Sequence, residues 1–377
     1  MAYGDIAKSK LDNLVLDTTG LSSIVLNVDG DIWAVAYVGP DNDGWIKTFS
    51  CTEEGVLGDA VIASLEFEST HCSQYHLDFK KISGTTYAVV YRDVSGSYGG
   101  VGELRTLTIN NDGTIDGLIA NWQFSTGAGF PQLLQRSGTT WIIFFNDTYV
   151  GQGVVGTTTI NNDGTLGAAW IDRTFCGTTC RNNRIAVANG DYYICAYNNT
   201  LAQGQISTIT IDSSGNVGDA FTDTDQFDTS IEAIGNILEL ASNYFCVSYD
   251  SDAAYFQSFT VNGSGATTLI GNQAYGTDTP STWMTTLYGT TMRAVCYEES
   301  GPTSVVETWG ISNIGVINGT AQDSWLFDNP GEDPYLIYLD NEDYHLIVGL
   351  TGSGLEAITY TMETAAAKAF IPKVIMI

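Results

Sequence analysis

The sequence has few of the side chains on which most catalytic and nucleic-acid-binding sites depend. Its 377 residues include three histidines and 14 lysines and arginines, against 43 aspartates and glutamates, for a formal charge of −29. With so few histidines, acid–base or nucleophilic catalysis through histidine has few possible positions. The acidic excess would repel nucleic acid and anionic membranes, so neither is an expected partner.

Targeting and membrane-spanning segments are also missing. No run of 18 or more apolar residues predicts a transmembrane helix, so membrane insertion is not expected. Residues 1–10, MAYGDIAKSK, lack the apolar core and small-residue cleavage site of a secretory signal. We therefore expect either that the sequence starts after processing or that the protein leaves its cell by another route. Release inside a virus particle is one such route, and the expected location is extracellular or on a virion surface.

The seven cysteines are an odd number and do not predict a disulfide framework. Cys176 and Cys180 bracket a loop, FCGTTC, where they could form a local disulfide, whereas zinc would need more ligands nearby. For Cys51 and Cys72 the sequence does not distinguish between a core position and another role. The remaining three lie in apolar runs and are predicted core residues: Cys195, Cys246 and Cys296.

One pattern recurs seven times, at intervals of about 50 residues. Each copy has a Gly- or Asn-containing turn followed by a strongly apolar strand, as in VDGDIWAVAY (28–37) and ISGTTYAVVY (82–91). A polar loop, a Thr-rich third strand such as LRTLTI (104–109), an NNDGT-type turn and a fourth strand follow. The apolar strands of the seven copies end at Tyr37, Tyr91, Phe145, Tyr197, Tyr249, Tyr297 and Gly349, which we call the closing positions.

Four-stranded antiparallel units of this length are typical of β-propeller blades. The second strand is apolar on both faces, which indicates that it lies between neighbouring sheets. Helical periodicity is absent until 363–370, ETAAAKAF, which could form a short helix. The predicted fold class is therefore all-β, a single seven-bladed propeller with four-stranded antiparallel blades.

The stretch 11–20, LDNLVLDTTG, looks like a fourth strand without a unit of its own, while the last unit, ending near 362, lacks one. We predict that this N-terminal strand completes the last blade and closes the ring, which also removes two sheet edges. The predicted organisation is an N-terminal arm (1–10), the propeller (11–362) and a C-terminal tail (363–377).

The repeat resembles those of uncharacterised propeller-like proteins of archaeal and environmental viral type. The resemblance is best in VDGDIWAVAYVGPDNDGWIKTFS (28–50) and in ISGTTYAVVYRD (82–93) with LRTLTINNDGTI (104–115), and it covers about nine-tenths of the chain. It implies a fold and not an activity. The GH…WD pairing and the SxDxGxTW box found in other propellers are not present.

Ligand sites in propellers usually lie on the face that carries the loops from second to third strand and the blade junctions. We expect the candidate residues in those loops, although any one aromatic among them could simply pack blade against blade. Aromatic planes beside charged and amide groups suit a glycan or a protein partner. The candidate ligand-binding residues are Tyr98, Arg92, Phe130, Tyr149, Arg181, Arg184, Trp283, Glu298 and Tyr335.

Two segments of the sequence contain residue types that bind metals. His71 and Cys72 are adjacent, as HC, with His76 nearby, but no further ligand is evident, so structural histidines are the expectation. His345 occupies the Trp33 position of its repeat and is a predicted core residue. Residues 41–44, DNDG, predict a turn, with Ca²⁺ as the alternative. No other cofactor is expected.

Three functions remain as hypotheses. The first is a non-enzymatic binding or structural propeller displayed on an assembly, such as a virion surface or tail, that binds a receptor, a glycan or a sister protein. The apolar tail, AFIPKVIMI (369–377), would contact a protein partner in that assembly. The second is a glycan-cleaving enzyme, which would need carboxylates such as Glu298, Glu299 and Asp333 to converge at the channel mouth. The third is an archaeal or bacterial cell-surface scaffold.

Overall fold

The structure is a computed structural model of the chain, which describes residues 5–94, 100–176, 180–276, 282–287, 291–299, 303–328, 332–339, 344–351 and 353–362. The side chains of 74–76, 169, 176, 299, 328 and 332–333 are outside that description, as are Tyr98 and the whole tail, 363–377. No helix in the described part of the chain has the length and hydropathy to span a membrane.

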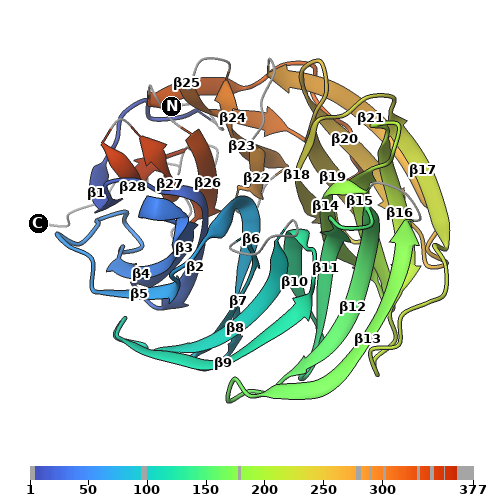
Figure 1. Cartoon of the computed structure of the whole chain (residues 1–377). Coiled ribbons are helices and arrows are strands. Elements are labelled where there is room, and N and C mark those ends of the chain that lie inside the picture. Colours follow the sequence, from blue (N-terminus) through green and yellow to red (C-terminus); the bar gives the residue numbers. More distant parts are fainter. Residues whose placement is uncertain are drawn as a thin grey trace, which may run out of the picture.

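Seven four-stranded antiparallel sheets form a ring around a common axis (Figure 1). This confirms the predicted fold. Blades 1 to 6 are β2–β5, β6–β9, β10–β13, β14–β17, β18–β21 and β22–β25, and blade 7 is β26, β27, β28 and β1. The elements are β1 (Asp12–Asp17), β2 (Leu21–Asp29), β3 (Ile32–Val38), η1 (Pro40–Asn42), β4 (Gly44–Ser50), β5 (Ala63–Glu68), β6 (Cys72–Ser83), β7 (Thr86–Asp93), β8 (Val101–Ile109), β9 (Ile115–Ser125), β10 (Gly129–Ser137), β11 (Thr140–Asp147), β12 (Gln152–Ile160), β13 (Leu166–Cys176), β14 (Arg181–Asn189), β15 (Tyr192–Asn198), β16 (Gly204–Thr210), β17 (Asp223–Asp228), β18 (Ala233–Ala241), β19 (Tyr244–Asp250), β20 (Ala254–Val261), β21 (Thr267–Gly276), β22 (Thr282–Thr286), β23 (Met292–Glu299), β24 (Thr303–Gly310), β25 (Asp323–Asp328), β26 (Glu332–Tyr338), β27 (Tyr344–Thr351) and β28 (Gly354–Thr361).

The N-terminal strand closes the ring. β1 pairs antiparallel with β28, from Asp12 opposite Thr359 to Asp17 opposite Leu355 (Figure 1). An isolated bridge between Ile6 and Met362 extends this pairing. The two ends of the described chain are therefore joined by backbone hydrogen bonds within one sheet. β28 is paired on both sides, with β27 and with β1.

The second strand of each blade lies between neighbouring blades, as its two-sided apolar pattern predicts. In β3 every residue after Ile32 is buried, and β15 and β19 have the same burial pattern. The buried clusters join one blade to the next: Val35 and Tyr37 of blade 1 pack with Leu346 and Val348 of blade 7. The core is thus a series of sheet-to-sheet contacts, which is why both faces of the second strand are mainly apolar.

A repeated hydroxyl contact links neighbouring blades at six of the seven joints in the described chain. A buried Thr or Ser in the third strand donates to the carbonyl of the glycine in the following blade's last hairpin turn, at 2.5 to 2.7 Å. The turn needs positive φ at this position, 85° at Gly215, which favours glycine. We call these contacts the hydroxyl latches. In the described chain they join Thr48 to Gly113, Thr106 to Gly164, Thr157 to Gly215, Thr208 to Gly265, Ser258 to Gly315 and Thr359 to Gly55.

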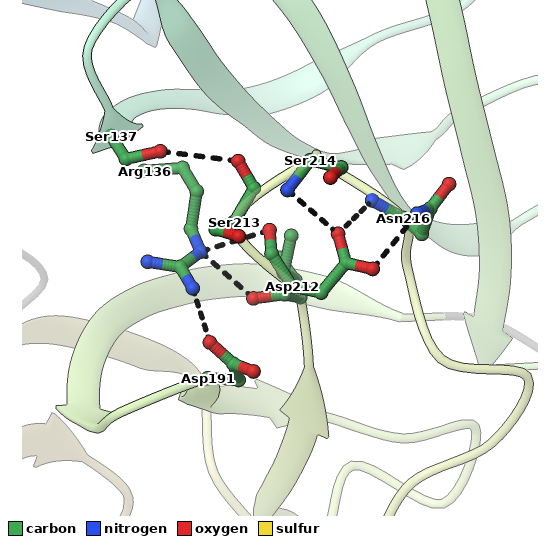
Figure 2. Close-up of polar contacts among 8 residues, drawn as sticks. Arg136, Ser137, Asp191, Asp212, Ser213, Ser214 and Asn216 are labelled. Carbon is green, nitrogen blue, oxygen red and sulfur yellow. Dashed lines mark hydrogen bonds and ion pairs between the residues drawn. The ribbon is translucent and has the colours of Figure 1, made fainter.

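The joint between blades 3 and 4 carries an additional charged contact near the hairpin turns (Figure 2). Arg136 of blade 3 donates from Nε to the carbonyls of Ile211 and Asp212 in blade 4, at 2.8 and 3.1 Å, and from Nη2 to Asp191. The Asp212 carboxylate accepts from the backbone and the side chain of Asn216, and these bonds shape the turn that Arg136 contacts. This contact between blades 3 and 4 adds to the Thr157 latch at the same joint.

Candidate functional site: the channel mouth

The inner strands begin earlier than the sequence pattern suggests. We expected Phe130, Arg184, Trp283 and Tyr335 in blade-junction loops, but the structure places them in β10, β14, β22 and β26. Most of these strands start with a register shift, for example between Gly129 and Gln132. Such a bulge breaks the two-residue alternation, so the first residues do not look like a strand in the sequence.

A cavity of about 290 Å³ lies where the inner strands begin, and every blade contributes to its wall. Residues from all seven inner strands line this one cavity, so these strands meet at the same end of the ring. Four of the nine candidate residues, those just placed in inner strands, line this cavity. One wall residue from each blade, in chain order, is Ile24, Leu77, Phe130, Arg184, Ile234, Trp283 and Tyr335.

The register defines seven equivalent positions around the channel. Each lies on the inner strand, opposite the residue just before the last residue of the repeated second-strand motif. In blade 4 that motif ends at Tyr197, and Arg184 lies opposite Ala196. In blade 5 this position is Asn236, whose backbone N–H donates to Ser248 Oγ at 3.2 Å. We call the set the channel ring, and it consists of Ile24, Asp78, Gln132, Arg184, Asn236, Trp283 and Tyr335.

Three members of the channel ring brace the inner strand of the next blade. Asp78 Oδ2 accepts from the backbone N–H of Leu133 at 2.9 Å, and Gln132 Oε1 accepts from that of Ile185 at 2.7 Å. Asn236 accepts from the N–H of Met284 at 3.0 Å and donates to its carbonyl at 2.8 Å. The polar groups of these side chains are bonded to the neighbouring strand. The other four members of the channel ring line the cavity: Ile24, Arg184, Trp283 and Tyr335.

Arg184 is the cation of the cavity. Its Nε donates to the carbonyl of Gly235 in the next blade, and its Nη1 donates to the carbonyl of Asn183 at 3.0 Å. Burial lowers the pKa of Arg184 to about 10, while attraction from Asp78 opposes that change. The guanidinium is therefore still protonated at neutral pH, in surroundings that solvate it poorly.

Aromatic rings form the apolar part of the wall. The rings of Trp283 and Tyr335 pack together with centroids 4.1 Å apart and planes 31° apart. Phe130 lies in blade 3, across the ring of blades from Trp283 and Tyr335. Its backbone has φ +50°, a value that residues other than glycine rarely adopt. All three side chains are only partly buried, so each presents surface to the cavity.

The other candidate residues lie outside the cavity. Arg92 and Glu298 are half-buried near the ends of β7 and β23, and burial lowers the pKa of Arg92. Tyr149 is 73% exposed in the loop after β11, as expected, and Arg181 is exposed at the start of β14. The predictions for Tyr98, for the side chains of Glu299 and Asp333 and for the tail concern residues outside the described part.

Sequence reasoning missed a set of ion pairs at the rim of the same face. Tyr37 and Lys47 of blade 1 donate to Asp17 Oδ2 of the closing strand, at 2.5 and 2.7 Å. Burial tends to raise the pKa of Asp17, but the bonds from Lys47 and Tyr37 outweigh it and the net pKa is lowered. The next joint repeats the arrangement with Tyr91, Arg105 and Glu68. The signal in the sequence was a carboxylate at the end of four of the seven fourth strands: Asp17, Glu68, Asp228 and Asp328.

The metal and cysteine predictions have mixed outcomes. No group of three or more His, Cys, Asp or Glu that could hold a metal occurs among the described residues. His345 is fully buried between the rings of Tyr338 and Tyr360, which confirms it as a core residue. Cys180 is buried, but the side chain of Cys176 is outside the described part, so their disulfide stays a prediction. Five other cysteines are buried: Cys51, Cys72, Cys195, Cys246 and Cys296.

Comparison with known proteins supports the fold. No protein-family model matches the sequence, and no curated protein matches it. The crystal structure of Sqt1 from Chaetomium thermophilum is similar, with a TM-score of 0.53 and 10% sequence identity over 92% of this chain and 99% of that chain. In all, 561 solved chains match. The protein is a seven-bladed β-propeller, and a likeness this widespread and this distant shows the fold alone.

Proposed function

We propose that the protein is a non-enzymatic binding propeller that holds its partner at the channel mouth. In this proposal it is displayed on the outside of an assembly, a virus particle, and the partner is a receptor, a surface glycan or a sister protein. The fold is compatible with a binding or structural role, and the cavity offers a concave site with aromatic walls and one cation.

The observation that carries the proposal is the diversity of the channel ring. Positions that join blades repeat their chemistry around the ring, as the hydroxyl latches do. The four channel-ring members that line the cavity instead differ in chemistry from blade to blade: Ile24, Arg184, Trp283 and Tyr335. A structural layer gains nothing from such asymmetry, whereas recognition of an asymmetric partner requires it.

The location on an assembly is tested by purification. If the protein is a virion or tail component, it should co-purify with particles, and a map of the particle should show the channel mouth turned outward. Recovery of the protein free of particles, or with the channel mouth buried against the particle, would contradict this part of the proposal.

Binding is tested with a glycan array and with purified partner candidates, using Trp283→Ala and a matched control. The control is Ile314→Ala, since Ile314 is 59% exposed in a hairpin turn on the opposite face. We expect Trp283→Ala to weaken binding at least 10-fold while Ile314→Ala does not, because truncating a central aromatic typically costs about 2 kcal/mol or more. Equal binding by the two variants would overturn the proposal.

A further inference from the structure

The cavity holds a cation with unused hydrogen-bonding capacity. The Nε and Nη1 atoms of Arg184 are bonded to the carbonyls of Gly235 and Asn183, which fixes the plane of the guanidinium. Its Nη2 has no acceptor among the described residues. An arginine held by two carbonyls with a third nitrogen left over is prepared to donate to one more acceptor, and it pairs best with an anion.

The nearby acid does not neutralise this cation completely. The two oxygens of Asp78 accept from the backbone N–H groups of Phe79 and Leu133, and Oδ1 also pairs with Lys80 at 2.9 Å. That carboxylate is therefore directed to its own strand and to the next blade. The overall charge of −29 opposes anions at long range, but charges farther away than about 10 Å are largely screened at 0.1 M salt.

The rest of the wall favours an apolar body. Its aromatic members are Phe130, Trp283 and Tyr335. Several of its polar groups are already bonded within the wall: Ser23 donates to the carbonyl of Val348 at 3.2 Å, and Thr282 Oγ1 bonds Ser248 Oγ at 3.0 Å. Few polar groups remain for the hydroxyls of a sugar. The volume of about 290 Å³ is at the lower limit for ligand pockets and suits a small molecule or one terminal group.

We infer that the channel mouth binds a carboxylate attached to a flat, apolar body, with the carboxylate on Arg184 Nη2 and the body against Trp283, Tyr335 and Phe130. This names the ligand chemistry of the proposed binding site and therefore rests on the proposed function. It also predicts that an aromatic acid is preferred to an acidic sugar, because the wall has aromatic surface to offer and few uncommitted polar groups.

The experiment titrates the full chain with phenylacetate, phenylacetamide and glucuronate, by calorimetry and tryptophan fluorescence. Phenylacetamide has the same shape without the charge, and glucuronate has the charge on a polar ring. We expect phenylacetate to bind with a Kd in the millimolar range or below and the other two at least 10-fold more weakly. Binding of glucuronate as tight as that of phenylacetate would overturn the apolar-body requirement.

The variants are Arg184→Gln and Arg184→Lys, with Arg173→Gln as the matched control, because Arg173 is a half-exposed cation on an outer strand. Loss of a charge-assisted bond predicts phenylacetate binding about 10- to 100-fold weaker for Arg184→Gln, with partial recovery in Arg184→Lys and no change in the control. Circular dichroism and the unfolding midpoint confirm that each variant is folded.

Two outcomes separate this inference from the proposed function. The inference is wrong if phenylacetate binds wild type and Arg184→Gln equally, or if it fails to bind at millimolar concentration. In either case the proposed function stands as long as partner binding still depends on Trp283. If phenylacetate binds as expected but no partner depends on Trp283, the cavity is a small-molecule site and the proposal of a macromolecular partner fails.

Discussion

Removing one hydroxyl latch should destabilise the protein by a measurable and specific amount. Thr106 is fully buried in β8, and its Oγ1 donates to the carbonyl of Gly164 at 2.7 Å. Thr106→Val keeps the shape and the β-branched side chain but removes the donor. The net hydrogen bond is lost, and the buried carbonyl is left without this donor. Together these effects predict a loss of about 1 to 3 kcal/mol in the free energy of unfolding.

The matched control is Thr108→Val, two residues along the same strand. Thr108 is half-buried and has no side-chain hydrogen bond in the described structure, so the same substitution should change stability by less than about 0.5 kcal/mol. Equilibrium urea unfolding, followed by the fluorescence of the eight tryptophans, measures both variants. If Thr106→Val is as stable as Thr108→Val, the latches do not contribute to holding the blades together, and the reasoning is refuted.

Further predictions concern the closing strand and the third-strand glycines. Since Asp17 has a lowered pKa when folded, its contribution is complete above its ordinary pKa of 3.8 and is lost as the pH falls through the lower folded value. Asp17→Asn should therefore be less stable at neutral pH but lose less stability below about pH 4, and parallel acid titrations of the two proteins would contradict the assignment. A Cβ on Gly153 would lie 2.2 Å from Cζ of Phe175, so Gly153→Ala should cost about 1 to 3 kcal/mol. Gly263→Ala, where nothing lies within 4 Å of the added atom, should change stability by less than about 0.5 kcal/mol. Equal urea midpoints for the two variants would contradict this prediction and show that the phenyl ring of Phe175 can move aside.

The architecture could be predicted because it depends on patterns that repeat. Seven copies of a two-sided apolar strand require seven neighbouring sheets, and an unpaired strand at one end with a vacancy at the other requires closure. The observed pairing of β1 with β28 follows from that reasoning. The Thr-rich third strands were visible as well, but the latch was not, because its acceptor is a backbone carbonyl in the next blade.

The cavity could be predicted only in part. Residue type alone indicates Phe130, Trp283 and Tyr335 as candidates. The sequence does not place Phe130 and Tyr335 in strands, because bulges interrupt the alternation of β10 and β26. Nor does a linear sequence show that Arg184 and Trp283 occupy equivalent positions, since the spacing between blades varies and the alignment depends on the register of each strand pair.

The most direct test of a binding site at the channel mouth is a hydrogen-exchange footprint of the protein with its bound partner or ligand. The account predicts slower exchange in peptides that contain the starts of the inner strands, 21–24, 129–132, 181–184, 233–236 and 282–284, which come from separate blades. Slower exchange confined to the outer strands or to the hairpin turns of the opposite face, with these five segments unchanged, would contradict it.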